Sequence, residues 1–207
     1  MKISYAITVC NELEEISKLL NFLHRYKRYS DEICVLLDKP KASQQLLDEL
    51  YYWSSKDIII LKESAFQGHF ANWKNELTVM CSGDYVFQID ADEMPSLTLI
   101  QSLHEILEHN SVVDLYAVPR VNTVEGMTQE HMQQWGWSVN EHGWINWPDY
   151  QTRIYKNTPE IKWIHKVHER LSGHKQFAYL PMEEFWSLDH PKTIERQIKQ
   201  NDYYNSL

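Results

Sequence analysis

The chain has 207 residues, of which 43% are apolar and 24% are charged, which is enough for one folded domain with a substantial core. Its formal net charge of −9 excludes the class of proteins that bind nucleic acid by neutralising phosphates with a basic surface. The three cysteines lack metal-ligand spacing, and neither a signal peptide nor a membrane span is recognisable, so we expect free thiols in a cytoplasmic protein without an integral membrane segment.

Short apolar runs alternate with amphipathic segments along the first part of the chain. Strands are expected at residues 3–9, 33–37, 58–61, 85–89 and 112–118. Helices are expected between them, the first capped by Asn11 and the others at residues 43–53, 72–81 and 97–107. Strands that alternate with helices predict an α/β fold, in which helices flank a mostly parallel central sheet.

Beyond Pro119 the periodicity weakens, and five tryptophans fall between residues 135 and 163. Residues 122–190 therefore predict an irregular, Trp-rich C-terminal lobe that forms one wall of a site. Residues 191–207 predict a C-terminal helix with Pro191 in its first turn. We expect the whole chain, residues 1–207, to form a single domain.

The strand at residues 85–89 runs directly into Asp90, Ala91, Asp92 and Glu93. Ligands of an open parallel sheet bind at the carboxyl ends of its strands. Three carboxylates in four residues repel one another unless a divalent cation or a strong hydrogen-bond network relieves the repulsion. Oxygen ligands suit Mg²⁺ or Mn²⁺, which keep open positions for substrate phosphates. The alternative is a solvated acidic turn in which Asp92 or Glu93 caps the next helix.

Other ways of holding a nucleotide are missing from the sequence. The first strand is followed by Cys10, Asn11 and Glu12 and not by a glycine-rich loop, and no P-loop motif occurs. The carboxylate of Glu12 would repel a phosphate placed at that helix start. A cation at the acidic run would instead bring a diphosphate to this acidic protein.

Three segments resemble the family-two glycosyltransferases of GT-A fold: ISYAITVCNE at residues 3–12, FANWKNE at residues 70–76 and GDYVFQIDADE at residues 83–93. The last segment contains the D-x-D motif of that family. Downstream, residues 119–122, 147–155 and 167–169 are similar to the bacterial branch that builds lipopolysaccharide cores. The resemblance implies an enzyme that moves a sugar from a nucleotide sugar to an acceptor hydroxyl with inversion.

The resemblance also implies a cofactor, Mn²⁺ or Mg²⁺. Asp92 would hold the metal directly, while Asp90 would contact the sugar or the ribose and assist the metal. His168 is a candidate for an additional ligand, because a neutral imidazole binds Mn²⁺. A histidine with a purely structural role is the alternative.

By the same resemblance, residues 1–121 would form the nucleotide-sugar-binding half, with a UDP-sugar as the expected donor. Asp38 would lie against the nucleobase, and Lys74 would contact a phosphate or the sugar. Arg153 would support a phosphate or orient Asp149, unless it only forms an ion pair on a strand. The other positions expected at the donor are Thr8, Asn11, Glu12 and Ala91.

An inverting transfer needs one carboxylate as general base on the face opposite the departing diphosphate. Asp149 is the first candidate, because an acid followed by glutamine and arginine resembles the pattern of the family, and Glu169 is the second. A glycan or glycolipid is the expected acceptor. Four indole rings could stack on its sugar or could anchor the lobe to the sheet: Trp135, Trp137, Trp144 and Trp147.

Two alternatives to glycosyl transfer remain open. The same acids could serve a metal-dependent nucleotidyltransferase or phosphohydrolase, although such enzymes of comparable fold usually carry a basic, glycine-rich loop after the first strand. The tryptophans could instead form the platform of a non-catalytic glycan-binding module.

Overall fold

The structure is a computed structural model that describes residues 1–205. Its central sheet has seven strands in the order β11-β6-β8-β4-β1-β2-β3. Their bounds are β1 Ile3–Val9, β2 Glu32–Asp38, β3 Ile60–Ser64, β4 Tyr85–Asp90, β6 Leu115–Val118, β8 Gln151–Lys156 and β11 Phe177–Tyr179. Only β8 runs antiparallel to its neighbours, β4 and β6. The predicted α/β fold with a mostly parallel central sheet is confirmed.

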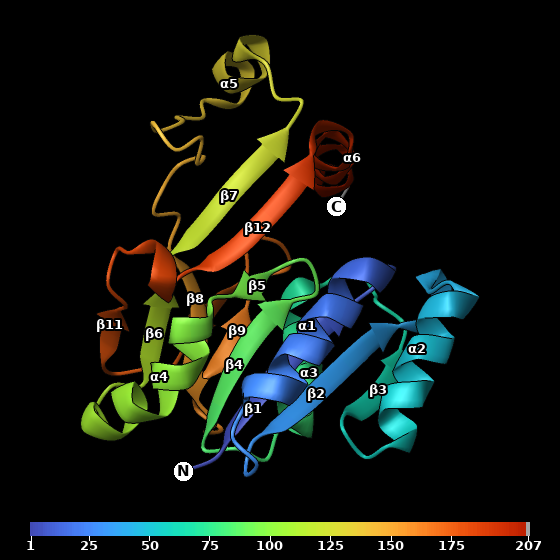
Figure 1. The fold of residues 1–207 in the computed structure, drawn as a ribbon, viewed down its shortest axis with the longest axis vertical. Helices are drawn as coiled ribbons and strands as arrows, with labels where there is room; N and C mark the ends of the chain where they lie inside the picture. Colours follow the sequence, from blue (N-terminus) through green and yellow to red (C-terminus); the bar gives the residue numbers. More distant parts are fainter. Residues whose placement is uncertain (206–207) are drawn as a thin grey trace.

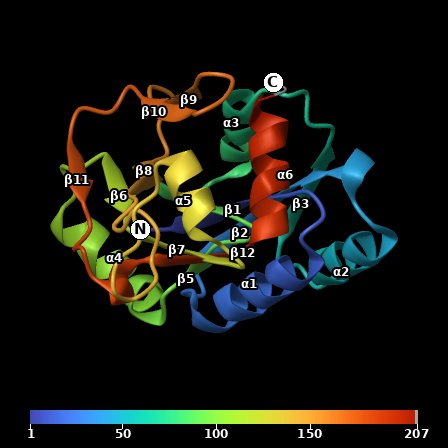
Figure 2. The ribbon, with the colours of Figure 1, turned by 90° about the horizontal axis from the view of Figure 1, so that it is seen from above.

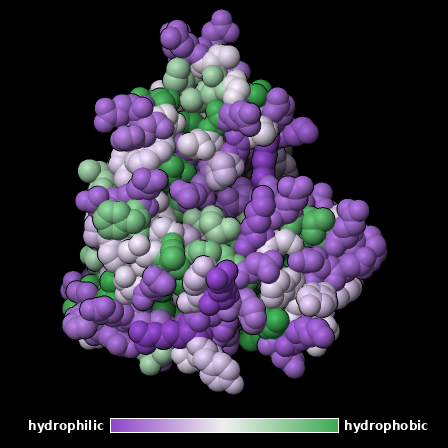
Figure 3. Space-filling model, in the orientation of Figure 1, coloured by the Kyte–Doolittle hydropathy of each residue, from purple (hydrophilic) through white to green (hydrophobic). Residues whose placement is uncertain are grey.

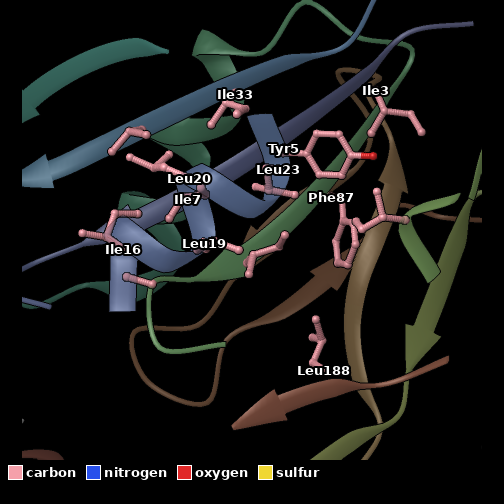
Figure 4. Packing of buried hydrophobic residues seen from close by; sticks show 14 of the residues in the cluster. Ile3, Tyr5, Ile7, Ile16, Leu19, Leu20, Leu23, Ile33, Phe87 and Leu188 are labelled. Atoms are coloured by element: carbon pink, nitrogen blue, oxygen red, sulfur yellow. The ribbon is translucent and has the colours of Figure 1, made fainter. Parts of the chain in front are cut away.

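Helices cover both faces of this sheet (Figures 1 and 2). The four that follow its strands are α1 Leu13–Tyr26, α2 Gln44–Ser55, α3 Phe70–Met80 and α4 Leu97–His109. Alternate residues of β1 separate the two layers: Tyr5 and Ile7 belong to the apolar cluster of α1, α2 and α4, whereas Ala6 belongs to that of α3. Figure 4 shows the first cluster, in which Tyr5 and Phe87 lie with their ring centroids 6.0 Å apart.

A second, smaller sheet projects from the carboxyl edge of the first (Figure 1). Its strands are β5 Met94–Pro95, β12 Leu188–Thr193 and β7 Arg120–Glu125, in that order. Helix α5, Gln129–Trp135, lies beyond β7, and helix α6, Ile194–Asn205, follows β12. The remaining short elements are the hairpin strands β9 Lys162–Ile164 and β10 Arg170–Ser172 and the 3₁₀ turns Lys39–Lys41 and Glu184–Trp186.

The face seen in Figure 3 is mainly hydrophilic, with small apolar patches between the hydrophilic regions. Among residues 1–205, no helix is long and apolar enough to span a membrane.

The predicted cap of the first helix is wrong. Glu12, not Asn11, is the N-cap residue of α1, and its carboxylate accepts the backbone N–H groups of Cys10 and Asn11 at 2.8 and 2.9 Å. The Asn11 side chain accepts instead from the backbone N–H of Ser43 at 3.1 Å. The pattern of Asn11 followed by Glu14 resembled a capping box, but the helix begins one residue later, after Glu12. Ser43, where the second helix was expected to begin, does cap α2.

The predicted C-terminal helix begins too early. Pro191 lies within β12, and α6 starts at Ile194. Strand β12 lies between β5 and β7, but β5 pairs only with Leu188 and Asp189. Beside Pro191 the edge that faces β5 is therefore unpaired, and a proline, which lacks an N–H group, is tolerated there. Residues 206–207 of the predicted helix lie outside the described residues. Strand β6 also begins at Leu115, three residues later than expected, after the exposed Val112.

Candidate active site

A cavity of about 790 Å³ opens where the carboxyl ends of β1, β2 and β4 meet the second sheet and α6. Its volume lies in the range of small-molecule sites. The carboxyl ends of adjacent parallel strands share one edge of a sheet, which is why Thr8, Asp38 and Asp90 come together there although they lie far apart in sequence.

Asp90, the last residue of β4, is surrounded by hydrogen-bond donors. Arg153 Nη2 donates at 2.7 Å, Gln88 Nε2 at 2.9 Å and Thr8 Oγ1 at 3.1 Å, while Lys74 Nζ lies 3.8 Å away. Burial alone would raise the pKa of Asp90, but the positive charges of Arg153 and Lys74 outweigh it and hold the pKa well below its usual value. Asp90 is therefore a fixed carboxylate whose oxygens are already hydrogen-bonded.

Arginines relieve much of the repulsion within the acidic run. Arg153, only 4% exposed, donates to Asp90 at 2.7 Å and to Glu93 at 2.6 Å. Arg120 Nη1 donates to the same Glu93 oxygen at 3.0 Å. Glu93 is thereby enclosed, with its charge balanced by two guanidinium groups. Arg153 contacts Asp90 and Glu93 in this structure, and Asp149 is held by Arg120.

Asp149, the first candidate for the general base, lines the cavity and is tightly oriented. Its Oδ2 atom accepts from Arg120 Nη2 at 2.7 Å, from Arg120 Nε at 2.9 Å and from Asn122 Nδ2 at 2.5 Å. Its Oδ1 atom accepts from Gln151 at 3.1 Å. Burial would raise the pKa of Asp149, but Arg120 and Asn122 lower it below its usual value. The residue also has a left-handed backbone, with φ of 33°, which such contacts can sustain.

Asp92 faces a histidine that sequence reasoning missed. His190 Nε2 and Arg196 Nη2 each lie 3.3 Å from Asp92 Oδ2. The other ring nitrogen of His190, Nδ1, lies 2.8 Å from Asn122 Oδ1. Because the Asn122 amide must present its NH₂ group to Asp149, its Oδ1 atom is an acceptor, and His190 Nδ1 must carry the hydrogen.

The consequence concerns the charge on His190. Burial lowers the pKa of His190 below its usual value, although the neighbouring Asp92 opposes this, so the ring is neutral at neutral pH. A neutral ring that carries its hydrogen on Nδ1 turns the lone pair of Nε2 toward the Asp92 carboxylate. The two atoms that converge in this way, a carboxylate oxygen and an imidazole nitrogen, are donor types that suit Mn²⁺. The described residues contain no group of three or more His, Cys, Asp or Glu side chains arranged to hold a metal, so further ligands would come from substrate or water.

Glu169, the second candidate for the base, is engaged in a different way. Its carboxylate forms an ion pair with Lys74 Nζ at 2.6 Å. Lys74 is only 5% exposed and lies over the Trp163 ring, 4.7 Å from its centroid. Glu169 therefore balances the buried charge of Lys74, as Asp149 balances that of Arg120.

The other predicted positions are distributed around the rim. Asp38 is buried, accepts from the backbone N–H of Phe66 at 3.0 Å and lies 3.4 Å from Lys41 Nζ. His168 lines the cavity from the exposed loop between β9 and β10. Glu12 and Ala91 also line the cavity. Asn11 points instead to the start of α2.

The architecture can be compared with known proteins. The model of a sequence family described as "Glycosyl transferase family 2" matches residues 4–172, well over half of the chain. The chain belongs to glycosyl transferase family 2. The match includes Asp90, Asp92 and Asp149 but ends before β12, so His190 and α6 lie beyond it.

Solved structures share the fold. The crystal structure of S. aureus TarS matches with a TM-score of 0.61 and 14% identity, over 92% of this chain and 37% of that chain. TarS residues 1–349 in complex with UDP-GlcNAc matches with a TM-score of 0.59 and 14% identity, over 93% of this chain and 59% of that one. The chain thus spans less than two thirds of these structures. No protein with a curated description matches it.

The family match and the shared fold confirm the resemblance to family 2 and the fold class expected from the sequence. The chain therefore carries a glycosyl transferase family 2 domain with the fold seen in the TarS structures. The resemblance to the branch that builds lipopolysaccharide cores, the role of the D-x-D motif and the roles of individual site residues stay predictions.

Proposed function

We propose that this protein transfers a sugar from a UDP-sugar to a hydroxyl of a glycan or glycolipid with inversion, assisted by a divalent cation. One observation carries the proposal: an ionised, oriented carboxylate and an Asp–His pair suited to a cation line the same cavity. Asp149 supplies the first, and Asp92 with His190 supplies the second.

Asp92 and His190 are the residues that would hold Mn²⁺ or Mg²⁺. The donor set supports this assignment, because a carboxylate oxygen and a neutral imidazole nitrogen converge there. When bound, the cation would neutralise charge on the diphosphate as it leaves. Asn122 fixes the orientation of the ring from its other side, in the way that ligating histidines are usually held. His168 lines the same cavity, but within residues 1–205 it does not join Asp92 and His190 in a group that could hold a metal.

The donor is proposed to lie along the ends of β1, β2 and β4. Structures of TarS, which shares this fold, are described as complexes with UDP and with UDP-GlcNAc, and this supports a uridine nucleotide. Asp38 would accept a hydrogen bond from the base, and Asp90 would accept one from the ribose or the sugar. Both carboxylates are held in place by donors of the protein, and their oxygens can accept a further hydrogen bond from a ligand.

Asp149 is the proposed general base. Its Oδ2 atom accepts three hydrogen bonds, whereas Oδ1 accepts from Gln151 and retains a lone pair. Oδ1 would take the proton of the acceptor hydroxyl as the hydroxyl oxygen forms a bond to the anomeric carbon. The bond from this carbon to the diphosphate oxygen breaks, and the electron pair leaves with the UDP. A single displacement of this kind inverts the anomeric centre.

The acceptor is proposed to bind below the projecting segment that carries α5. Trp137 lines the cavity together with Asp149 and Asn146. Its indole ring packs against Trp135, with centroids 4.7 Å apart, and this contact would hold it as a rigid wall. A flat aromatic wall beside a general base is suited to the apolar face of a sugar ring.

Incubation of the protein with UDP-GlcNAc as the probe donor, with Mn²⁺ or with a chelator, tests the proposal. Mass spectrometry of the products should show UDP formation and sugar transfer that depend on the metal. Release of UMP and a sugar phosphate would favour a nucleotidyltransferase or phosphohydrolase. Glycan binding that persists in chelator, without any response to nucleotide sugars, would favour a binding module.

A further inference from the structure

Most basic side chains around the cavity are already neutralised by carboxylates. Lys74 pairs with Glu169, and Arg120 and Arg153 share Glu93. These groups form the floor of the site, where their charges hold the acids in place. They leave little positive charge for the diphosphate of a donor.

Strand β12 and helix α6 bring further cations to the opposite wall. Lys192 Nζ donates to Gln200 at 2.5 Å, and no carboxylate within residues 1–205 lies close enough to form an ion pair with it. Arg196 lies between three acids. Its Nη2 atom is 3.3 Å from Asp92 and 3.6 Å from Glu12, and its Nη1 atom is 2.7 Å from Glu15.

Helix α6 rests on the body through polar contacts. None of its residues 194–203 is buried. Arg196 ties its first turn to the start of α1, and at the other end the Lys41 ammonium lies over the Tyr203 ring, 5.3 Å from its centroid. Figure 2 shows α6 lying across the carboxyl edge of the sheet, between α1 and α3. Partly exposed ion pairs contribute little stability, so the helix can shift when a ligand offers stronger partners.

We propose that β12 and α6 form a diphosphate clamp, in which Arg196 exchanges Asp92 for the diphosphate of the donor and Lys192 binds the same group. The inference rests on the proposed function, because it assigns residues to the donor of that reaction. A cation at Asp92 would repel the guanidinium group 3.3 Å from the same carboxylate. The diphosphate that arrives with the cation gives this guanidinium a new anionic partner with matching geometry.

The exchange predicts that Arg196→Gln changes the affinity for Mn²⁺ alone and the affinity for Mn²⁺ with UDP in opposite directions. Arg196 competes with a cation for Asp92 in the free protein but assists the cation once a diphosphate is present. Arg196→Gln should therefore bind Mn²⁺ alone at least as tightly as the wild type, and about twofold to fivefold more tightly where the competition is strong. It should bind Mn²⁺ with UDP about tenfold or more weakly, which is the usual cost of losing a charge-assisted contact. A purely structural arginine would weaken both.

Isothermal titration with four probes tests the clamp: Mn²⁺, UDP with Mn²⁺, inorganic pyrophosphate with Mn²⁺, and uridine. Arg196→Gln and Lys192→Gln should lose affinity for both diphosphates and keep wild-type affinity for uridine. Arg25→Gln, which removes an exposed charge from α1, is the matched control and should behave as the wild type. Amide hydrogen exchange in α6 should slow when UDP and Mn²⁺ are added to the wild type.

The outcomes separate the clamp from the proposed function. The clamp would be overturned if Arg196→Gln lost affinity equally for uridine and for UDP, or if it kept wild-type affinity for both UDP and pyrophosphate. Wild-type binding of pyrophosphate without UDP binding would contradict the UDP donor, and weaker pyrophosphate binding in Arg196→Gln would still support the clamp. If the wild type binds neither diphosphate, both inferences fail.

Discussion

The two ends of the central sheet carry similar networks of charged side chains. At the amino ends of the strands, Glu32 accepts from Lys2 at 2.5 Å, from Ser4 at 2.6 Å and from Ser82 at 2.6 Å. At the carboxyl ends, Asp90 accepts from a comparable set of donors, which includes Arg153 at 2.7 Å. Hydrogen bonds within a cluster therefore do not distinguish a site from a structural network.

The two ends of the sheet differ in the open space beside the charged side chains and in whether a lone pair there lacks a hydrogen-bond donor. At the amino ends, Gly83 packs so closely that a Cβ atom there would lie 2.7 Å from the backbone nitrogen of Ser4. The carboxyl ends border a cavity of about 790 Å³, and there, in the tautomer assigned above, the lone pair of His190 Nε2 turns toward Asp92. Charged clusters point to function where such unmatched atoms meet an accessible volume.

The largest effect is expected from Asp149→Asn, which keeps the shape of the side chain but removes the proposed base. We expect kcat to fall by about 10²- to 10⁴-fold, with the affinity for the donor close to that of the wild type and a lower melting temperature, because Arg120 loses the charge of its partner. Steady-state transfer assays measure this. Glu169→Gln is the comparison, and we expect a loss of about tenfold at most, because Glu169 balances Lys74. A larger loss of kcat in Glu169→Gln than in Asp149→Asn would mean that Glu169, and not Asp149, is the general base.

Asp92→Asn should give the next largest effect. Removal of one carboxylate charge from the Asp92–His190 pair should weaken Mn²⁺ binding and lower kcat/KM by about a hundredfold, since a bound cation contributes several kcal/mol to the stabilisation of a leaving diphosphate. Titration of activity with Mn²⁺ should show a shift to higher concentrations of metal. An unchanged dependence on Mn²⁺ would remove Asp92 from the metal site.

Trp137→Ala should affect the acceptor alone. Loss of an aromatic wall is expected to raise KM for the acceptor about tenfold, which corresponds to about 1.4 kcal/mol of stacking and burial. KM for the donor should not change. Trp144→Ala is the control, because Trp144 packs on Trp147 and does not line the cavity. Equal changes in both variants would mean that these rings only support the projecting segment.

The sequence predicted the part of the molecule whose signals are local. The strands around residues 3–9 and 85–89 are mainly apolar runs, and Asp90 and Asp92 follow the second of them directly. The family resemblance drew on the same local segments, and the family match confirms it. Local apolar patterning was therefore sufficient for the first strands of the central sheet and for the position of the acidic run. It did not show that β8 and β11, which lie within the residues expected to form the lobe, join the same sheet.

The rest depends on contacts between distant residues. His190 meets Asp92 across 98 residues, and it stands beside a proline in a segment that resembled the start of a helix. Asn122 lay in a segment noted for its resemblance, but its role depends on holding Asp149 and His190 at once. Periodicity and spacing carry no information on such pairings, so only the fold could reveal them.

The smallest functional effect is expected at the opposite end of the sheet. Burial alone would raise the pKa of Glu32, but hydrogen bonds from Lys2, Ser4 and Ser82 outweigh it and lower the pKa to about 2. A depressed folded-state pKa adds stability above the unfolded value near pH 4.3 and loses it as the pH falls toward 2. Glu32→Gln should therefore unfold more easily than the wild type at pH 7, by about 1 to 2 kcal/mol after allowance for solvent screening. Denaturant unfolding should show this difference shrinking between pH 4.5 and about pH 2, while kcat and both KM values at pH 7 stay at wild-type levels. A loss of transfer activity in folded Glu32→Gln would show that the two ends of the sheet are coupled, and a difference in stability that does not vary with pH would mean that the carboxylate charge is not what stabilises this network.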